Sequence, residues 1–420
     1  MHAATINRIV GINESYKLPG ALMSALLGDP VAMMDQFMMI GEPLEHDWFT
    51  GYFEEEHANK SKMAQDFTPP EVCDLLAHVV GLGDVVGDVC AGTGGLTIGM
   101  WSKNKDATFL CYEYSERALP LLLFNLAVRN IDAYVCRCNL LTGEEFEYYK
   151  TTRGSKYSRV EAVGEMPDLK CDLVVSNPPY SQKYDPKSDQ RFPEYKDMLP
   201  SNFADFVFVA FGLTLLKGGG KAGFILPHGV LFRANKEGAF RKMLVESGTL
   251  RSIIGLPDKL FINTDIPTCI LEMQTSREPS GILIIDAKDE AQKAGKKNII
   301  TGEHLRKICE AYDARTEAEG FAHVAPVQEV VGNQFNLNIP RYVDSFVHEP
   351  LPDFVEVMEN LGQLEKDIVA EELKLLEMVR QLYGTTPQAD ERFRKGLRKY
   401  KQAITNAAGE YEQGVMKLEP

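Results

Sequence analysis

Val85-Val-Gly-Asp-Val-Cys-Ala-Gly-Thr-Gly-Gly-Leu-Thr-Ile-Gly-Met-Trp101 is the stretch that indicates the fold. Its pattern predicts a strand, a glycine-rich turn and the start of a helix. A Gly-x-Gly-Gly turn lets the backbone approach a ligand closely, and the next helix points its positive N-terminal end there. The spacing is not the Gly-x-Gly-x-x-Gly of dinucleotide binders, so NAD is not the expected ligand. Taken alone, the loop is equally consistent with a tight turn.

Three more strands are predicted along the chain. They cover Ala107 to Glu113, Ala133 to Arg137 and Cys171 to Val175, and a helix is expected from Ala118 to Val128. Alternating strands and helices over residues 66–275 predict an α/β fold with a doubly wound sheet. The ends of parallel strands meet at the carboxyl edge of such a sheet, where ligands bind.

Two of these strand ends carry polar side chains. Glu113 lies 25 positions after Asp88, close to the spacing at which an acid meets ribose hydroxyls. Any single Glu is more simply interpreted as a solvated acid. A binding role for Glu113 is indicated only by its position at a strand end, in order with the other motifs. The third strand runs into Cys138-Asn139-Leu140.

The fourth strand runs directly into Ser176-Asn-Pro-Pro-Tyr180. Proline cannot continue a central strand, so the strand must end here. Asn177 offers an amide oxygen as acceptor, the prolines leave unused backbone carbonyls, and Tyr180 offers a flat ring for stacking. Such a loop can hold the amino group of an adenine taken out of a nucleic-acid stack. Alone, this motif is more often an ordinary turn, but with the glycine loop it implies an adenosine-type cofactor beside a pocket for an amino-bearing base.

With these motifs in this order, the chain resembles the gamma-type N6-adenine DNA methyltransferases that use S-adenosylmethionine (SAM). Asp66-Phe-Thr-Pro-Pro70 precedes the glycine loop and resembles the segment that opens the gamma-type arrangement. Three later stretches resemble the modification subunit of type I restriction–modification systems, namely Lys217–Arg233, Ile254–Leu271 and Asn333–Val343. The resemblance covers roughly residues 60–345 and implies a Rossmann-like SAM-dependent methyltransferase fold.

The resemblance also implies roles for individual residues. The catalytic residues would be Asn177, Pro178, Pro179 and Tyr180, with the adenine N6 donating to the Asn177 side chain and the Pro178 carbonyl. SAM would be the cofactor, and no metal is expected. The residues expected to contact SAM are Phe67, Thr68, Pro69, Asp88, Cys90, Ala91, Gly92, Thr93, Gly94, Glu113, Tyr114, Asn139, Leu140 and Asn177.

The chain departs from the family pattern at three places. The cofactor loop reads Asp-Val-Cys-Ala-Gly where the family usually has Asp-Pro-Ala-Cys-Gly, and the glycines remain. Asn139 replaces a common Asp and still offers an acceptor to the adenine of SAM, but without charge. Tyr180 stands where Phe is frequent, and either ring can stack.

Composition bears on partners. The 420 residues carry a net charge of −15, whereas a protein that grips phosphate backbones by itself is normally basic. The main grip on double-stranded DNA is therefore expected from a partner. Eight cysteines without Cys-x-x-Cys spacing indicate reduced core residues of a cytoplasmic protein, and we find no signal peptide and no membrane span.

The chain is predicted to have three parts: a helical region over residues 1–60, a catalytic domain over 61–345, and a helical tail over 346–420. Residues 142–170 are polar and are expected to form an insertion, solvated or touching DNA. Residues 181–201 are expected to form a mobile lid near the target base.

The tail carries a heptad pattern, which predicts a coiled coil. Its apolar positions are Phe354, Val357, Leu361, Leu364, Ile368, Leu375, Met378 and Leu382. The stripe could pack on its own domain or on a partner helix, and a basic helix follows over residues 392–401. No built-in recognition domain is evident, so the resemblance implies a separate specificity subunit that binds two copies of this chain, and possibly a nuclease subunit.

Two other functions stay open from the residues themselves. Asn-Pro-Pro-Tyr also occurs in methyltransferases that act on RNA bases or on glutamine side chains, and the later motifs and the tail favour DNA over these. A catalytically silent SAM-binding scaffold is the third possibility, and the intact Asn177, Pro178 and Tyr180 argue against it.

Overall fold

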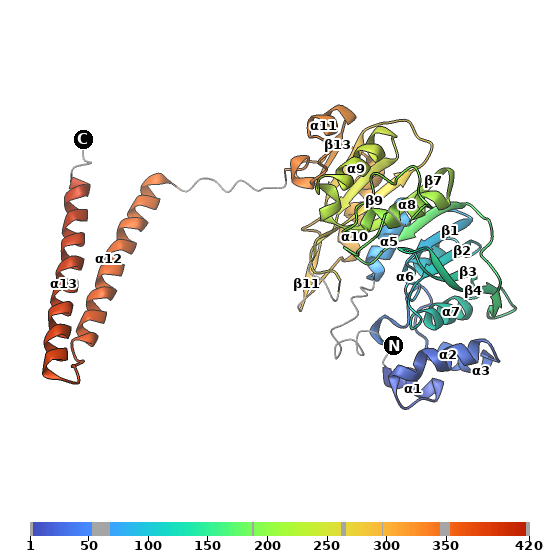
Figure 1. Cartoon of the computed structure of the whole chain (residues 1–420), viewed down its shortest axis with the longest axis horizontal. Coiled ribbons are helices and arrows are strands. Elements are labelled where there is room, and N and C mark those ends of the chain that lie inside the picture. Colours follow the sequence, from blue (N-terminus) through green and yellow to red (C-terminus); the bar gives the residue numbers. More distant parts are fainter. Residues whose placement is uncertain are drawn as a thin grey trace. The chain divides into compact units, whose positions relative to one another are not determined.

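The computed structural model describes residues 3–52, 68–186, 189–261, 266–295, 297–344 and 353–416 (Figure 1). The chain forms two compact units, Met1–Ser345 and Phe346–Pro420. The predicted boundary at residue 60 lies outside the described residues, and the three-part division stays a prediction.

Eleven strands among the described residues form one mixed sheet in the order β13-β10-β8-β9-β7-β6-β1-β2-β3-β4-β5. Its centre, β3-β2-β1-β6-β7, is parallel, while β9 runs antiparallel to both β7 and β8. The predicted doubly wound α/β sheet is confirmed. The strands are β1 Val85–Val89, β2 Thr108–Glu113, β3 Asp132–Asn139, β4 Glu144–Thr152, β5 Arg159–Val163, β6 Cys171–Ser176, β7 Leu216–Pro227, β8 Leu250–Gly255, β9 Thr268–Gln274, β10 Ile282–Asp286 and β13 Ala322–Ala325; β11 Gln292–Ala294 and β12 Lys297–Ile299 form a separate pair.

Both faces of the sheet are covered, because successive side chains of a buried strand point to opposite faces. In β2, Phe109 joins one apolar cluster and Leu110 joins the other. The first cluster takes in helices α5 Pro70–Val80, α6 Gly95–Lys103, α7 Leu119–Val128 and α10 Gly302–Ala314, and the second takes in α8 Asp205–Leu215 and α9 Lys236–Glu246. Helix α11 Val327–Gly332 and the short 3-10 turns η2 His228–Leu231 and η3 Ile339–Arg341 complete this unit.

The polar stretch after β3 is not the insertion that we expected. It forms β4, which pairs antiparallel with β3, and β5, which pairs antiparallel with β4 and extends the sheet at this edge. The physical reason is alternation along β4: Tyr149 and Thr151 are buried on the side of α7, while the residues between them remain accessible. A one-sided antiparallel strand can be polar on its other face, so overall polarity was a misleading guide.

The N-terminal helices pack against α7, which in turn packs on the sheet. They are α1 Ala3–Val10, α2 Leu18–Leu26 and α3 Val31–Met38, with η1 Ser15–Lys17 between the first two. The ring of Phe124 in α7 lies 4.6 Å from that of Phe37 and 5.6 Å from that of Phe49. Contact with the sheet on one side and these helices on the other explains why every residue of α7 is buried.

The second unit is a hairpin of two long helices, α12 Phe354–Val379 and α13 Pro387–Met416. The two helices pack through apolar residues such as Leu376 and Ile404, both at most 7% exposed. The heptad stripe itself is not covered, since its members are 41–75% exposed. No described helix of either unit is long and apolar enough to cross a membrane.

Candidate functional site

The glycine loop follows β1 and turns through left-handed backbone. Cys90, Gly92 and Gly94 have φ of 70°, 57° and 96°. A side chain at Gly94 would place its Cβ 2.9 Å from the Leu122 side chain, so glycine is needed there for close packing as well as for the turn. A Cβ at Gly92 would meet nothing within 4 Å, so the loop is open on that side. The loop thus presents backbone, with free space in front of it, at the N-terminus of α6.

Asp88 lies beneath this loop and is fully buried. Its Oδ2 accepts hydrogen bonds from the Thr97 backbone nitrogen at 3.0 Å and from Thr97 Oγ1 at 2.5 Å. Its Oδ1 has no hydrogen-bond partner among the described residues. Burial raises the pKa of this carboxyl to about 7, because desolvation disfavours the charged form.

Glu113 ends β2 and is tied to the glycine loop. Its Oε2 accepts from the Gly92 backbone nitrogen at 2.7 Å, and its Oε1 accepts from that of Ser115 at 2.6 Å. Burial raises the pKa of this carboxyl, and the backbone bonds oppose the shift. Glu113 is only 4% exposed, so it is not the solvated acid of the simpler interpretation. The neighbouring Tyr114 is 63% exposed and points away from this buried core.

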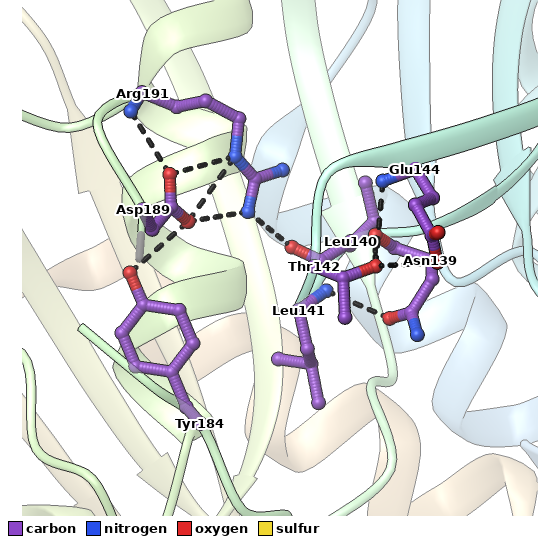
Figure 2. A network of polar contacts seen from close by, with 8 residues as sticks. All are labelled: Asn139, Leu140, Leu141, Thr142, Glu144, Tyr184, Asp189 and Arg191. Atoms are coloured by element: carbon purple, nitrogen blue, oxygen red, sulfur yellow. Dashed lines mark hydrogen bonds and ion pairs between the residues drawn. The ribbon is translucent and has the colours of Figure 1, made fainter. Parts of the chain in front are cut away.

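Two segments converge at the end of β3 (Figure 2). Asn139 Oδ1 accepts from the Leu141 backbone nitrogen at 3.0 Å and so shapes the turn after the strand. Arg191, from the stretch beyond the Asn-Pro-Pro-Tyr loop, donates through Nη2 to the Leu140 carbonyl at 2.6 Å. Asp189 holds the guanidinium at 2.5–3.1 Å and also accepts from the Tyr184 hydroxyl at 3.0 Å. The segment predicted as a lid is therefore fastened to the β3 turn.

The Asn-Pro-Pro-Tyr loop follows β6 and contacts the start of α5. Asn177 Nδ2 donates to Thr68 Oγ1 at 2.9 Å, and the Tyr180 hydroxyl donates to Asn177 Oδ1 at 2.8 Å. Pro178 is buried and Pro179 is exposed. The structure therefore brings the Thr68-Pro69 segment and this loop together, and Phe67 lies outside the described residues.

The strand register explains why the two loops are neighbours. Val89, the last residue of β1, pairs with Tyr112 of β2 and with Ser176 of β6. Ser176 Oγ also donates to the Val89 carbonyl. The glycine loop, Glu113 and Asn177 thus leave the same edge of the sheet from adjacent strands.

A buried ion-pair network supports the Asn-Pro-Pro-Tyr loop from below. Asp205, at the start of α8, is fully buried and accepts from the Ser181 backbone nitrogen at 2.9 Å. Its other oxygen lies 3.2 Å from Arg233, which also lies 3.2 Å from Glu237. Sequence reasoning missed these residues, because nothing near them in the chain links a charge at 205 or 233 to a backbone nitrogen at 181.

Asp47, from the N-terminal region, also reaches the glycine loop. Asp47 accepts from Thr93 Oγ1 at 2.5 Å and from Asn125 Nδ2 at 2.7 Å. Arg129, directly after α7, holds the same segment through the carbonyls of Leu44 and His46. No motif marks Asp47, because its partner in the glycine loop, Thr93, is 46 residues away.

This sheet order, with a glycine loop after β1, an acid at the end of β2 and the Asn-Pro-Pro-Tyr loop after β6, is the arrangement of the SAM-dependent methyltransferases. A solved class I SAM-dependent methyltransferase from Listeria monocytogenes shares the fold, with a TM-score of 0.50 and 16% identity over 74% of this chain and 94% of that one. The sequence matches the N-6 DNA Methylase family over residues 46–349, and the chain belongs to this family.

Two relatives specify the branch of the family. The methylase subunit of the type I restriction enzyme MjaVIII of Methanocaldococcus jannaschii is 30% identical over 342 residues, which are 77% of this chain and 56% of that protein. The crystal structure of a type I restriction–modification methyltransferase subunit from Streptococcus thermophilus has a TM-score of 0.62 and 28% identity, covering 81% of this chain and 76% of that one. The chain spans about half to two thirds of the length of the curated relatives it matches.

Proposed function

We propose that this chain transfers a methyl group from SAM to N6 of an adenine in double-stranded DNA, as the modification subunit of a type I restriction–modification complex. One observation carries the proposal. The glycine loop and the Asn-Pro-Pro-Tyr loop leave adjacent strands of a chain of the N-6 DNA Methylase family, and Asn177 bonds to Thr68 between them.

The residues around the glycine loop fit SAM. Asp88 keeps one buried oxygen without a partner, and the loop is open at Gly92. Buried polar atoms are normally satisfied, so an unsatisfied acceptor beside an open loop supports a ligand with hydrogen-bond donors. We assign the stretch from Asp88 to Gly94 to the methionine end, Glu113 to the ribose hydroxyls, and Asn139 with Leu140 to the adenine. When bound, SAM supplies an electrophilic methyl group.

The Asn-Pro-Pro-Tyr loop supplies the chemistry on the target side. Asn177 Oδ1 and the Pro178 carbonyl accept hydrogen bonds from the amino group of a flipped adenine, and the Tyr180 ring stacks on the base. These acceptors draw the amine away from conjugation with the ring and localise its lone pair. No protein nucleophile is required, so positioning and fixed dipoles supply most of the rate.

The partners follow from the tail and from the charge. The apolar stripe of α12 is exposed, and the chain carries a net charge of −15. We propose that α12 docks on the helical spacers of a specificity subunit, with two copies of this chain per specificity subunit. That subunit would supply sequence recognition and most of the grip on DNA, and a nuclease subunit could join the complex.

The test is a methylation assay with the chain co-expressed with its specificity subunit. Tritiated SAM and duplex DNA should yield N6-methyladenine at one sequence, detected by nucleoside chromatography. Matched assays with RNA and with a glutamine-containing protein substrate should stay at background. Methyl transfer to either of those, with none to DNA, would contradict the proposal.

A further inference from the structure

Two of the stretches that resemble modification subunits meet at a common recess of about 540 Å³: Lys217–Arg233 ends beside it, and Asn333–Val343 begins in its lining. One wall is the first part of α9 with the residues before it, and the other is the turn between α11 and η3. Three of the side chains that line the recess are basic, and none of the described lining residues is acidic. The basic residues are Arg241, Lys242 and Arg341. The composition of this lining is that of an anion site.

The two walls are held together by hydrogen bonds to backbone. Arg241 is buried and donates through Nε to the Phe335 carbonyl at 3.1 Å and through Nη1 to the Val230 carbonyl at 2.9 Å. The Leu337 backbone nitrogen donates to the Leu231 carbonyl at 2.8 Å. The recess is therefore built by contacts between segments about 100 residues apart, and a ligand would meet a largely formed site.

The three cations differ in how far the protein already neutralises them. Arg241 lies close to the buried Glu237, and Lys242 Nζ is 3.7 Å from the exposed Glu246. Arg341 is exposed and has no ion pair among the described residues. Arg341 and Lys242 can thus offer N–H donors and positive charge to a ligand without breaking a buried contact.

The recess lies at the carboxyl edge of the sheet. Strand β7 ends at Pro227, immediately before η2, and Gly255 at the end of β8 packs so closely on Ile339 that an added Cβ would lie 2.6 Å from its side chain. Phe232, which lines the recess, precedes Arg233. Since Arg233 supports the Asn-Pro-Pro-Tyr loop through Asp205, the recess adjoins the side of the site where the target base would enter.

We propose that this recess binds a backbone phosphate of the DNA strand that carries the target adenine. The inference rests on the proposed function. A phosphodiester presents negative charge and acceptor oxygens, which match the Arg341 guanidinium, the Lys242 ammonium and the Asn333 and Asn336 amides of the lining. Contacts of this kind fix the register of the duplex without reading its sequence.

The experiment measures binding of a fluorescent target duplex to the full complex by anisotropy over a series of salt concentrations. Arg341→Ala should make the slope of log K against log salt shallower by about one, because one phosphate contact is lost. The apparent Kd should rise by roughly tenfold at fixed salt. Arg341→Lys should keep the wild-type slope, and SAM affinity should be unchanged in both variants.

Arg306→Ala is the control, since it also removes an exposed arginine, but from α10, which packs on the opposite face of the sheet from α9. Equal slopes and Kd values for Arg341→Ala and Arg306→Ala would overturn the proposal. Titration with inorganic phosphate tests whether the recess binds a free anion and not the DNA backbone. Phosphate binding that depends on Arg341, with unchanged duplex affinity in Arg341→Ala, would make the recess a free-anion site. An Arg341-dependent salt slope in a complex that transfers no methyl would support the phosphate site and refute the proposed activity.

Discussion

The two units of the chain differ in how far they bury their side chains. The first unit, Met1–Ser345, buries its apolar core, and even its acids Asp88, Glu113 and Asp205 are at most 4% exposed. The tail leaves apolar side chains such as Leu364 and Ile368 more than half exposed. Burying one such side chain contributes roughly 1.5–3 kcal/mol of free energy, so covering the exposed stripe would contribute substantially to binding. The first unit covers its apolar residues within its own fold, whereas the described part of the tail leaves an apolar stripe exposed, which fits the docking proposed above.

Within the tail, the two helices already use a different face of α12. Leu376 is buried against α13, and Val369 is half-buried on the same side. These positions lie beside the predicted heptad stripe and not on it. Packing on α13 therefore stabilises α12 although its heptad stripe is not covered. The stripe stays exposed, as the proposed docking requires.

The largest expected effect tests the tail. Leu364→Asp with Ile368→Asp would bury two charges in any seam, which costs several kcal/mol and should weaken association with the specificity subunit by more than about a thousandfold. Co-purification and site-specific methylation should both be lost, while SAM affinity measured by calorimetry persists.

The control for the tail is Glu359→Gln with Lys366→Gln, on exposed positions of α12 away from both the stripe and α13. That variant should co-purify like the wild type. Tight, sequence-specific methylation by the isolated chain carrying the two Asp substitutions would show that recognition resides in this polypeptide.

The second-largest expected effect tests the Asn-Pro-Pro-Tyr loop of the first unit. Asn177→Ala removes both the proposed acceptor for the adenine amine and the bond to Thr68. Loss of one preorganised group of this kind lowers kcat by roughly a hundred- to a thousandfold. Single-turnover methylation should show this loss, and SAM affinity should largely survive. Full activity of Asn177→Ala would refute the assignment of the catalytic loop.

A smaller effect is expected at the cofactor loop. Glu113→Ala removes the group assigned to the ribose and leaves the Gly92 nitrogen without its acceptor. Loss of such a buried partner costs roughly 1–3 kcal/mol, so SAM affinity should fall by about ten- to a hundredfold.

Isothermal titration with SAM measures the Glu113 effect, and Glu116→Ala, at an exposed acid three residues further on, serves as the control. The partner interaction of the tail should be intact in both variants. Unchanged affinity in Glu113→Ala would place the ribose elsewhere.

The sequence was sufficient to predict the parallel centre of the sheet, because each of its features is local. A buried strand, a glycine turn and a helix start can be read within about 15 residues. The supports of the site could not be predicted in this way. Arg191 holds a carbonyl 51 residues away, Asp205 a nitrogen 24 residues away, and Asp47 a hydroxyl 46 residues away.

The charges on these three supports do not reveal their partners. Arg191 and Asp205 bind backbone atoms, which every residue has, and Asp47 binds a threonine hydroxyl. The sequence therefore contains no complementary charge that would indicate the partner. The strands β4 and β5 were not predicted for a related reason. About half of their residues are exposed and polar, so the stretch lacks the continuous apolar run of the central strands.

The smallest effect concerns the hydroxyl of Tyr180, where Phe is frequent in related loops. In the structure, this hydroxyl donates to Asn177 Oδ1 at 2.8 Å and so occupies the acceptor assigned to the adenine amine. Asn177 is held independently by its bond to Thr68, so its orientation does not depend on the hydroxyl. Tyr180→Phe should therefore free the acceptor and keep the stacking ring. A net hydrogen bond contributes roughly 0.5–1.5 kcal/mol, so KM for DNA should fall by about two- to tenfold with kcat unchanged. Thr68→Val is the matched comparison and should lower kcat, because it removes the bond that orients the amide. A tenfold lower kcat in Tyr180→Phe would instead make the hydroxyl a positioning group for Asn177.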